Sequence, residues 1–416
     1  MSKELYLKCV KCGREYHEAG ILYTCRDCGI AGILDVVLDY PRIRQEMTRQ
    51  SLKRNSDYSM WRYRPAIPLE GTKGIQPLQV GWTPLYETAR FAKETGLKSL
   101  LVKDDSRNPT ASLKDRASAV GVAKAIELSQ RVICAASTGN AASSLAGFAA
   151  SAGIKTYIFV PETAPEAKVA QLLIYGANVF LIKGTYDAAV ELCFQAAARF
   201  DWYNRSCAIN PYLVEGKKTV AYEICEQLGW QAPDIAVVAV GDGCTIAAVW
   251  KGFLECFKLG LIDRLPKLIG VQAAGANPVT RAYLNNSRSF DYLKPQSIAD
   301  SISVGIPRNG IKALKAISES KGLMIDVTDD EILSAMRIMA QGTGIFGEPA
   351  GVASFAGIIK LHQLGLLDEK ARVVSIISGG GLKDIKSAVL AAGQATIIEP
   401  DISEVEKFIR RKNPND

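Results

Sequence analysis

The sequence has little histidine, because only His17 and His362 occur among its 416 residues. Two histidines are too few for a metal site built from several imidazoles, and they leave few candidates for a histidine base. Long apolar runs are also missing, and the N-terminus has no signal-peptide pattern. We therefore expect a cytoplasmic protein with no membrane partner.

Blocks of like charge are absent as well. The 50 lysines and arginines outnumber the 43 acidic residues, but they are spread along the chain, so we expect no nucleic-acid partner. Apolar residues make up 48% and charged residues 22%, which is ordinary for a soluble globular protein. The length allows two or three domains with a large core.

Four of the ten cysteines form two close pairs near the N-terminus, Cys9 with Cys12 and Cys25 with Cys28. Two such pairs separated by 12 residues can surround one tetrahedral zinc ion. The spacing predicts a zinc-ribbon-like module at residues 1–38, and the alternative is four reduced thiols that hold no metal. The other six cysteines lie singly in apolar contexts, where we expect buried, reduced side chains.

Beyond residue 78, short apolar runs alternate with helical periods. Strands are expected at 99–102, 131–135, 155–160, 178–182, 235–240, 267–271 and 373–377, with helices between them. This alternation predicts an α/β fold with parallel sheets and right-handed crossovers. Ligands of such folds bind at the carboxyl ends of the strands, so the turns that follow the strands are the candidate sites.

Four of these turns have unusual sequences. Residues 108–116 place Lys114 between an expected strand and an expected helix, and Ser137-Thr138-Gly139-Asn140 follows the next strand. The other two turns are 241–245 and 378–381. By position alone, Lys114 is either a solvated surface lysine or an amine held beside helix-start N–H donors, where a phosphate or a Schiff-base partner could bind.

The turn at 241–245 consists of small residues and leads into an expected helix. Glycines let the backbone turn its N–H groups inward, and the start of a helix adds a positive partial charge. A phosphate could therefore bind there, although glycine turns between a strand and a helix are common. The three companion turns strengthen this interpretation.

Together these stretches resemble the threonine synthase family, within the fold type II (tryptophan synthase beta-like) enzymes that use pyridoxal phosphate. The resemblance covers nearly the whole chain, since many members also carry an N-terminal ribbon. It is carried by the stretches 108–116, 137–140, 209–219, 241–245, 270–275, 346–350 and 378–384.

The resemblance implies a role for each matching position. Lys114 would be the Schiff-base lysine and proton shuttle, Asn140 would bind the phenolic oxygen of the cofactor, and Ser378 would meet its pyridine nitrogen. The cofactor phosphate would bind the N–H groups of Gly241, Asp242, Gly243, Cys244 and Thr245. The substrate would bind Ser137, Thr138 and Gly139, with Asp242 and Asn210 as further candidates.

The resemblance also implies a function and an architecture. O-phospho-L-homoserine and water would give L-threonine and phosphate, and the protein would be a homodimer. We expect a large domain at 50–115 and 190–416, a small domain at 116–189, and the cofactor between them.

Several positions depart from the family pattern. Ala111 and Leu113 replace the usual glycine and phenylalanine, which we expect to be packing changes, and Gly380 stands where many members have histidine. Leu213 replaces an arginine and Asp242 an asparagine, both associated with the substrate phosphate. Losing a cation and gaining a carboxylate disfavours a phosphorylated ligand.

The departures at 213 and 242 leave alternatives open. One is a lyase or β/γ-replacement enzyme that acts on an unphosphorylated, possibly diamino, amino acid. A non-enzymatic alternative is a zinc-ribbon binding protein on the same scaffold. Other cations, Lys168, Arg205, Lys217 and Lys218, could replace the missing arginine if they reach the site.

Overall fold

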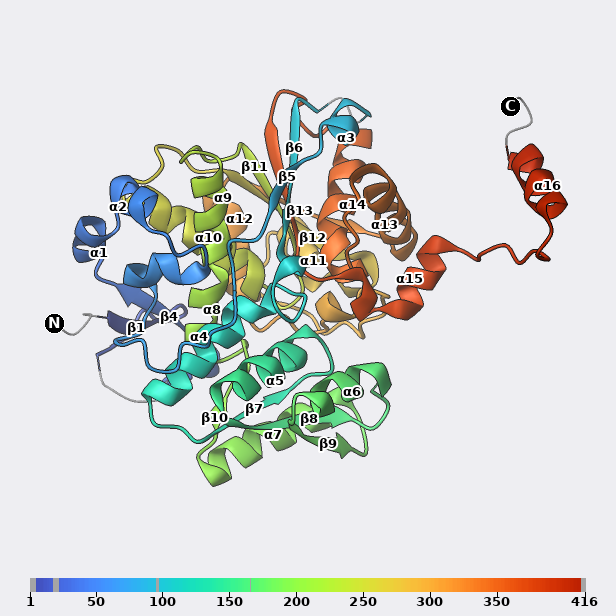
Figure 1. The fold of residues 1–416 in the computed structure, drawn as a ribbon. Coiled ribbons are helices and arrows are strands. Elements are labelled where there is room, and N and C mark those ends of the chain that lie inside the picture. Colours follow the sequence, from blue (N-terminus) through green and yellow to red (C-terminus); the bar gives the residue numbers. More distant parts are fainter. Residues whose placement is uncertain (1–4, 18–21, 95–96, 165, 413–416) are drawn as a thin grey trace.

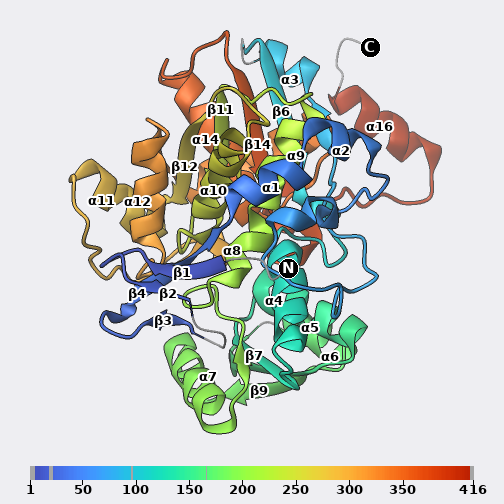
Figure 2. The same ribbon diagram turned by 90° about the vertical axis from the view of Figure 1, so that its left-hand side faces the viewer.

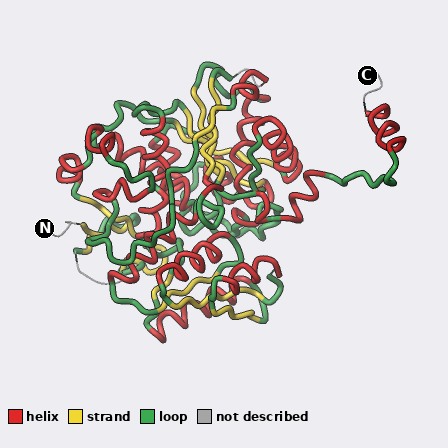
Figure 3. Tube along the Cα trace, in the orientation of Figure 1, coloured by secondary structure: helices red, strands yellow, loops and turns green. Residues whose placement is uncertain are grey.

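Two parallel sheets and one small antiparallel sheet organise the chain, and helices lie outside the parallel sheets (Figures 1 and 3). The computed structural model describes residues 5–17, 22–94, 97–164 and 166–412. The module expected at 1–38 therefore includes residues 1–4 and 18–21, which lie outside the described part. No helix in the described ranges is long and apolar enough to cross a membrane.

The larger sheet has six strands in the order β13-β12-β11-β14-β6-β5, and its first five strands run parallel. The edge strand β5 is antiparallel to β6. The strands are β5 (Leu85–Glu87), β6 (Ser99–Asp104), β11 (Ile235–Ala239), β12 (Lys267–Ala273), β13 (Leu323–Val327) and β14 (Arg372–Ile377).

Both faces of this sheet are covered, which explains why β11 is apolar at every position. Val237 packs with α14 (Pro349–Gln363) in one hydrophobic cluster, while Val238 packs with α10 (Cys244–Lys258) in another. α12 (Gly310–Glu319) lies beside α10, and α13 (Asp329–Thr343) packs on α14.

The smaller sheet has four parallel strands in the order β10-β7-β8-β9. α5 and α7 cover its opposite faces, because their apolar residues belong to different clusters. The elements of this part are β7 (Val132–Ala136), α5 (Asn140–Ala152), β8 (Lys155–Pro161), α6 (Glu166–Ile174), β9 (Asn178–Ile182), α7 (Tyr186–Phe200) and β10 (Tyr203–Asn204). The domain boundaries inferred from the sequence stay a prediction.

Further helices lie in the connections between and beyond the sheets. They are α1 (Tyr40–Glu46), α2 (Arg49–Arg54), α3 (Ala89–Glu94), α4 (Lys114–Glu127), α8 (Tyr212–Lys217), α9 (Thr219–Gln227), α11 (Pro278–Leu284), α15 (Ile385–Ala392) and α16 (Ile402–Lys412).

The N-terminal antiparallel sheet has the order β2-β1-β4-β3 and lies between α12 and α7 (Figure 2). Its strands are β1 (Leu5–Cys9), β2 (Glu15–Tyr16), β3 (Thr24–Cys25) and β4 (Gly29–Leu38). On the α12 side, Asp35 forms an ion pair with Lys312. On the other side, the Tyr23 hydroxyl accepts a hydrogen bond of 2.7 Å from the backbone N–H of Asn204. The N-terminal sheet is thus linked both to α12, beside the six-stranded sheet, and to β10 of the four-stranded parallel sheet.

Candidate active site

Lys114 is the first residue of α4, so the lysine belongs to the helix and not to the turn before it. Two backbone hydrogen bonds tie this turn to the one that follows β14. The N–H of Leu113 donates to the carbonyl of Ser378 at 2.9 Å, and the N–H of Gly380 donates to the carbonyl of Ala111 at 3.0 Å. Two of the four turns that the sequence singled out therefore pair directly.

Ala111 corrects one expectation. The change from glycine at this position is not a packing change, because Ala111 has a φ of 62° and lies in the left-handed region that favours glycine. A side chain there costs about 1–2 kcal/mol of backbone strain. The two hydrogen bonds to the turn after β14 hold the strained conformation next to Lys114.

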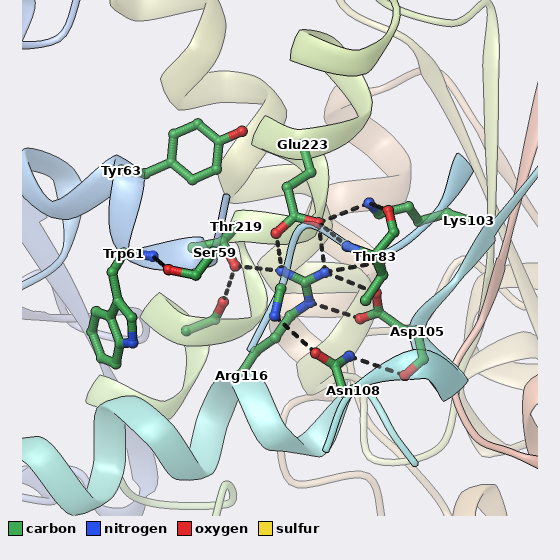
Figure 4. Close-up of polar contacts among 12 residues, drawn as sticks. Ser59, Trp61, Tyr63, Thr83, Lys103, Asp105, Asn108, Arg116, Thr219 and Glu223 are labelled. Carbon is green, nitrogen blue, oxygen red and sulfur yellow. Dashed lines mark hydrogen bonds and ion pairs between the residues drawn. The ribbon is translucent and has the colours of Figure 1, made fainter. Parts of the chain in front are cut away.

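A buried ionic cluster anchors the first turn of α4, two residues after Lys114 (Figure 4). Arg116 lies among Asp105, Glu223, Thr83 and Thr219, and all its charged contacts are buried. Its Nε atom is 2.7 Å from Asp105 Oδ2, and its Nη2 atom is 2.8 Å from Glu223 Oε2.

Lys103 completes this cluster from β6, with its Nζ atom 2.7 Å from Glu223 Oε2. Burial alone would raise the pKa of Glu223, but the charges of Arg116 and Lys103 lower it to about 2. Two cations thus balance two carboxylates, and removing one partner would leave a buried charge unpaired. The cluster holds the start of α4, and with it Lys114, against β6 and α9.

The sequence prediction gave no role to Glu348, although this residue meets Asn140. Asn140 Nδ2 donates to Glu348 Oε1 at 2.6 Å, across 208 residues of sequence. A side chain at Gly379 would come within 2.3 Å of Glu348 Oε1, so the turn after β14 passes close to this pair. Burial raises the pKa of Glu348, and the positive charges of Lys383 and Lys114 oppose that rise.

A cavity of about 1550 Å³ opens beside these turns. A recess of about 20 Å³ shares Thr138, Lys168 and Lys383 with it and ends at Asn140 and Glu348. The hydrogen bond between Asn140 and Glu348 therefore lies at the inner end of the recess.

The helices that follow β7 and β11 start without side-chain caps, and the first of these starts lines the recess. α5 begins at Asn140 after Gly139, and α10 begins at Cys244 after Gly243. The first N–H groups of an uncapped helix have no partner within the helix, and they favour an anion. The first start suits a carboxylate beside Ser137, Thr138 and Gly139, and the second suits a phosphate.

The turn before α10 is packed too closely for side chains at its glycines. A Cβ atom at Gly241 would lie 2.8 Å from Ile302 Cα, and one at Gly243 would lie 2.6 Å from the carbonyl oxygen of Asn309. Gly243 also has a φ of 90°. Both glycines are therefore required by the packing of this turn against Ile302 and Asn309.

Asp242 lies in this turn, but its carboxylate is engaged. Its Oδ1 atom accepts a hydrogen bond of 2.7 Å from the backbone N–H of Arg308, and burial raises its pKa. Leu213 is fully buried, and a side chain at Gly121 would come within 2.6 Å of its Cδ2 atom, so it packs against α4. Asn210 uses its amide within its own segment, bonded to the backbone of Asn204 and Tyr212.

Two buried cations, Arg205 and Lys217, do lie beside Lys114. Arg205 Nη2 is 3.4 Å from the carbonyl oxygen of Lys114, and both cations approach the sulfur of Cys207. Lys217 Nζ is 3.2 Å and Arg205 Nη1 is 3.6 Å from that sulfur. Neither cation forms an ion pair with a carboxylate among the residues that the structure describes.

This arrangement changes two pKa values. Burial and the positive charges of Lys217 and Arg205 lower the pKa of Lys114 to about 8, although Cys207 and Glu348 act in the opposite direction. The pKa of Cys207 lies well below its usual range, because Cys244 hydrogen-bonds to its sulfur and the two cations stabilise its charge. Lys114 can therefore serve as a base near neutral pH.

The other two candidate cations are engaged elsewhere. Lys218 is buried between Glu215 and Glu255, and Lys168 pairs with Asp300 at the cavity.

The four N-terminal cysteines come together, with all their sulfurs within 4.8 Å of one another. The sulfurs of Cys12 and Cys25 are 3.6 Å apart. Zinc–sulfur bonds of about 2.3 Å in a tetrahedron place neighbouring sulfurs about 3.8 Å apart, so the cluster has the size that such an ion requires.

Comparison with known proteins gives sequence relatives along almost the whole chain. Residues 77–379 match a family described as pyridoxal-phosphate dependent enzyme. A threonine synthase of Methanocaldococcus jannaschii is 40% identical over 405 residues, which cover 97% of this chain and 99% of that protein. A threonine synthase of Methanosarcina acetivorans is 39% identical over 406 residues, which cover 97% and 98%.

Two solved structures share the fold at lower identity. Diaminopropionate ammonia lyase from Escherichia coli has a TM-score of 0.65 at 18% identity, covering 94% of this chain and 97% of that chain. Threonine deaminase isoform 2 from Solanum lycopersicum has a TM-score of 0.64 at 21% identity, covering 75% and 83%.

Proposed function

Because the chain belongs to the threonine synthase family of pyridoxal-phosphate dependent enzymes, we propose that it converts O-phospho-L-homoserine and water to L-threonine and phosphate. The cofactor, when bound, supplies an electron sink that stabilises negative charge developing next to the amino group of the substrate. The protein supplies the groups that bind the substrate, orient it and move its protons.

One observation carries the choice of a phosphorylated substrate, namely the position of Arg205 and Lys217 beside Lys114. Two buried cations share one partner, the sulfur of Cys207, and a thiolate there balances only one of them, so positive charge is left for an anionic ligand. They can replace the arginine that is missing at Leu213. The carboxylate of Asp242 already accepts a hydrogen bond from the backbone N–H of Arg308, so its negative charge argues less strongly against a phosphorylated substrate.

The local geometry supports each remaining role that we propose. The lowered pKa of Lys114 supports its role as the base that accepts the α-proton. The uncapped start of α5 would hold the substrate carboxylate, and the start of α10 would hold the cofactor phosphate. Ser378, whose carbonyl is fixed by Leu113, would present its hydroxyl to the pyridine nitrogen.

The bond changes balance without any further reagent. The Cγ–O bond breaks and phosphate leaves, Cβ loses one proton and bonds to the oxygen of water, and water releases one proton. Cγ gains one of these two protons and the leaving phosphate takes the other. Lys114 is our candidate for the group that carries protons between the substrate carbons. The alternative, an unphosphorylated diamino substrate, rested on Leu213 and Asp242 and gains no support from either position.

A substrate panel tests the proposal. Phosphohomoserine, phosphoserine, serine, threonine, 2,3-diaminopropionate and 2,4-diaminobutyrate would each be offered to the purified holoenzyme, followed by assays for phosphate, ammonia and amino-acid products. We expect threonine and phosphate in equal amounts from phosphohomoserine, and none from Lys114→Ala. Faster turnover of a diamino acid than of phosphohomoserine would overturn the proposal.

A further inference from the structure

Six cysteines lie outside the N-terminal cluster, and their thiols interact in three pairs. The pairs are Cys134 with Cys193, Cys225 with Cys256, and Cys207 with Cys244. The sequence predicted buried side chains for all six. Five of them are buried, but Cys207 is partly exposed, so it differs from the others.

Two cations contact the sulfur of Cys207. Lys217 Nζ lies 3.2 Å from it and Arg205 Nη1 lies 3.6 Å from it. Neighbouring cations stabilise a thiolate, and the thiolate is the form of cysteine that attacks oxidants. Burial instead raises the pKa of Cys256 well above its usual range, so that thiol stays protonated.

The backbone of Cys207 holds Cys244 close to it. The sulfur of Cys244 donates a hydrogen bond of 3.1 Å to the carbonyl oxygen of Cys207, and Asn309 Nδ2 donates to the same oxygen at 3.0 Å. Cys244 is also the first residue of α10, so its position is fixed by the helix. A second thiol that lies against a reactive cysteine can resolve the oxidised sulfur into a disulfide.

We propose that Cys207 is an oxidation site for hydroperoxides and that Cys244 is its resolving thiol. The Cys207 thiolate attacks one peroxide oxygen, the O–O bond breaks, and hydroxide leaves Cys207 as a sulfenic acid when the oxidant is hydrogen peroxide. The Cys244 sulfur then bonds to the Cys207 sulfur. The hydroxyl of the sulfenic acid and the proton of the Cys244 thiol leave together as water. The two sulfurs thus lose two electrons, and the peroxide gains them.

The disulfide would change the charge beside Lys114. A thiolate at Cys207 raises the pKa of Lys114, so its conversion to a disulfide should lower that pKa. The rate profile of the oxidised enzyme should therefore move to lower pH, and dithiothreitol should restore it. This consequence rests on the proposed function, whereas the oxidation itself does not.

Peptide mapping of the holoenzyme after treatment with hydrogen peroxide tests the site without any turnover. Free thiols are blocked with iodoacetamide, and the chain is cut with trypsin and with a protease that cleaves after glutamate. Glu226 lies between Cys225 and Cys244, so the two cysteines fall on different peptides. We expect a cross-link between Cys207 and Cys244, while Cys225 and Cys256 remain free as the internal control.

Variants separate the two steps. Cys244→Ser should stop at the sulfenic acid, which dimedone traps at Cys207, and Cys225→Ser should cross-link as the unchanged chain does. Lys217→Gln should slow the oxidation by up to about 30-fold at pH 7, because a thiol with an ordinary pKa of about 8.5 is only about 3% ionised there. Lys168→Gln is the matched control, since Lys168 pairs with Asp300.

Two outcomes would overturn the proposal. One is that Cys207 and Cys244 remain free thiols when Cys225 and Cys256 have been oxidised. The other is a Lys217→Gln variant that cross-links as fast as the unchanged chain, since the cation would then not activate Cys207.

Discussion

Replacing Lys217 with glutamine should selectively weaken the binding of phosphorylated substrate. The side chain is fully buried and lies 3.2 Å from the sulfur of Cys207, where it is held beside Lys114. At an effective dielectric near 20, unit charges about 4 Å apart interact by about 4 kcal/mol. Desolvation reduces this value, and a hydrogen bond to a charged group contributes about 1.5–3 kcal/mol net.

That range corresponds to a rise of about 10- to 150-fold in the KM for phosphohomoserine. The same change removes a positive neighbour of Lys114, so the pKa of Lys114 should rise and the pH profile should move to higher pH. Steady-state assays at several pH values measure both effects. Lys168→Gln is the matched control, because Lys168 is a cation that lines the cavity but pairs with Asp300.

Two results would refute the reasoning about Lys217. An unchanged KM for phosphohomoserine would mean that the ammonium does not meet the substrate. A weaker affinity for the cofactor, with the KM unchanged, would assign Lys217 to the cofactor phosphate at the start of α10 instead.

Four further outcomes are expected. The rate should rise through about pH 8, because Lys114 must lose its proton to act as a base, and a rate independent of pH between 6 and 10 would contradict this role. Arg116→Met should lower the free energy of unfolding in urea by about 3–5 kcal/mol, whereas Arg14→Met, which breaks an exposed pair, should cost under about 1 kcal/mol. Ala111→Gly should raise that free energy by about 1 kcal/mol through relief of backbone strain, and a loss of stability would show that the strain is absent. Treatment with a chelator, which would remove metal from the four-cysteine cluster, should lower the melting temperature and raise the KM for phosphohomoserine. The reason is that the N-terminal sheet holds Asn204 next to the buried cations. An unchanged melting temperature and KM would mean that the cluster carries no metal.

Much of the fold could be predicted because most strands of the two larger sheets contain an apolar run that is bounded by clear turns. Strands β8 and β11 lie within one residue of their predicted positions. Strand β13 was missed, since its five residues include Asp326 and are only partly buried. The family and the enzyme class are confirmed by the relatives.

The candidate site could be predicted only where it follows the sequence locally. The turns around Lys114 and Gly241 each combine a strand end with a helix start, and such a pattern is visible in one stretch of residues. The hydrogen bond between Asn140 and Glu348 depends on tertiary packing, so it could not be predicted from the sequence of either segment. The strain at Ala111 was missed for the same reason, because a φ value is not visible in a residue name.

The most direct measurement of the central claim uses phosphohomoserine in water enriched in oxygen-18, with mass spectrometry of the products. Addition of water at Cβ predicts one heavy oxygen in threonine and none in the released phosphate, and no labelled threonine from Lys114→Ala. Labelled phosphate with unlabelled homoserine, or release of a keto acid and ammonia, would contradict the proposed reaction.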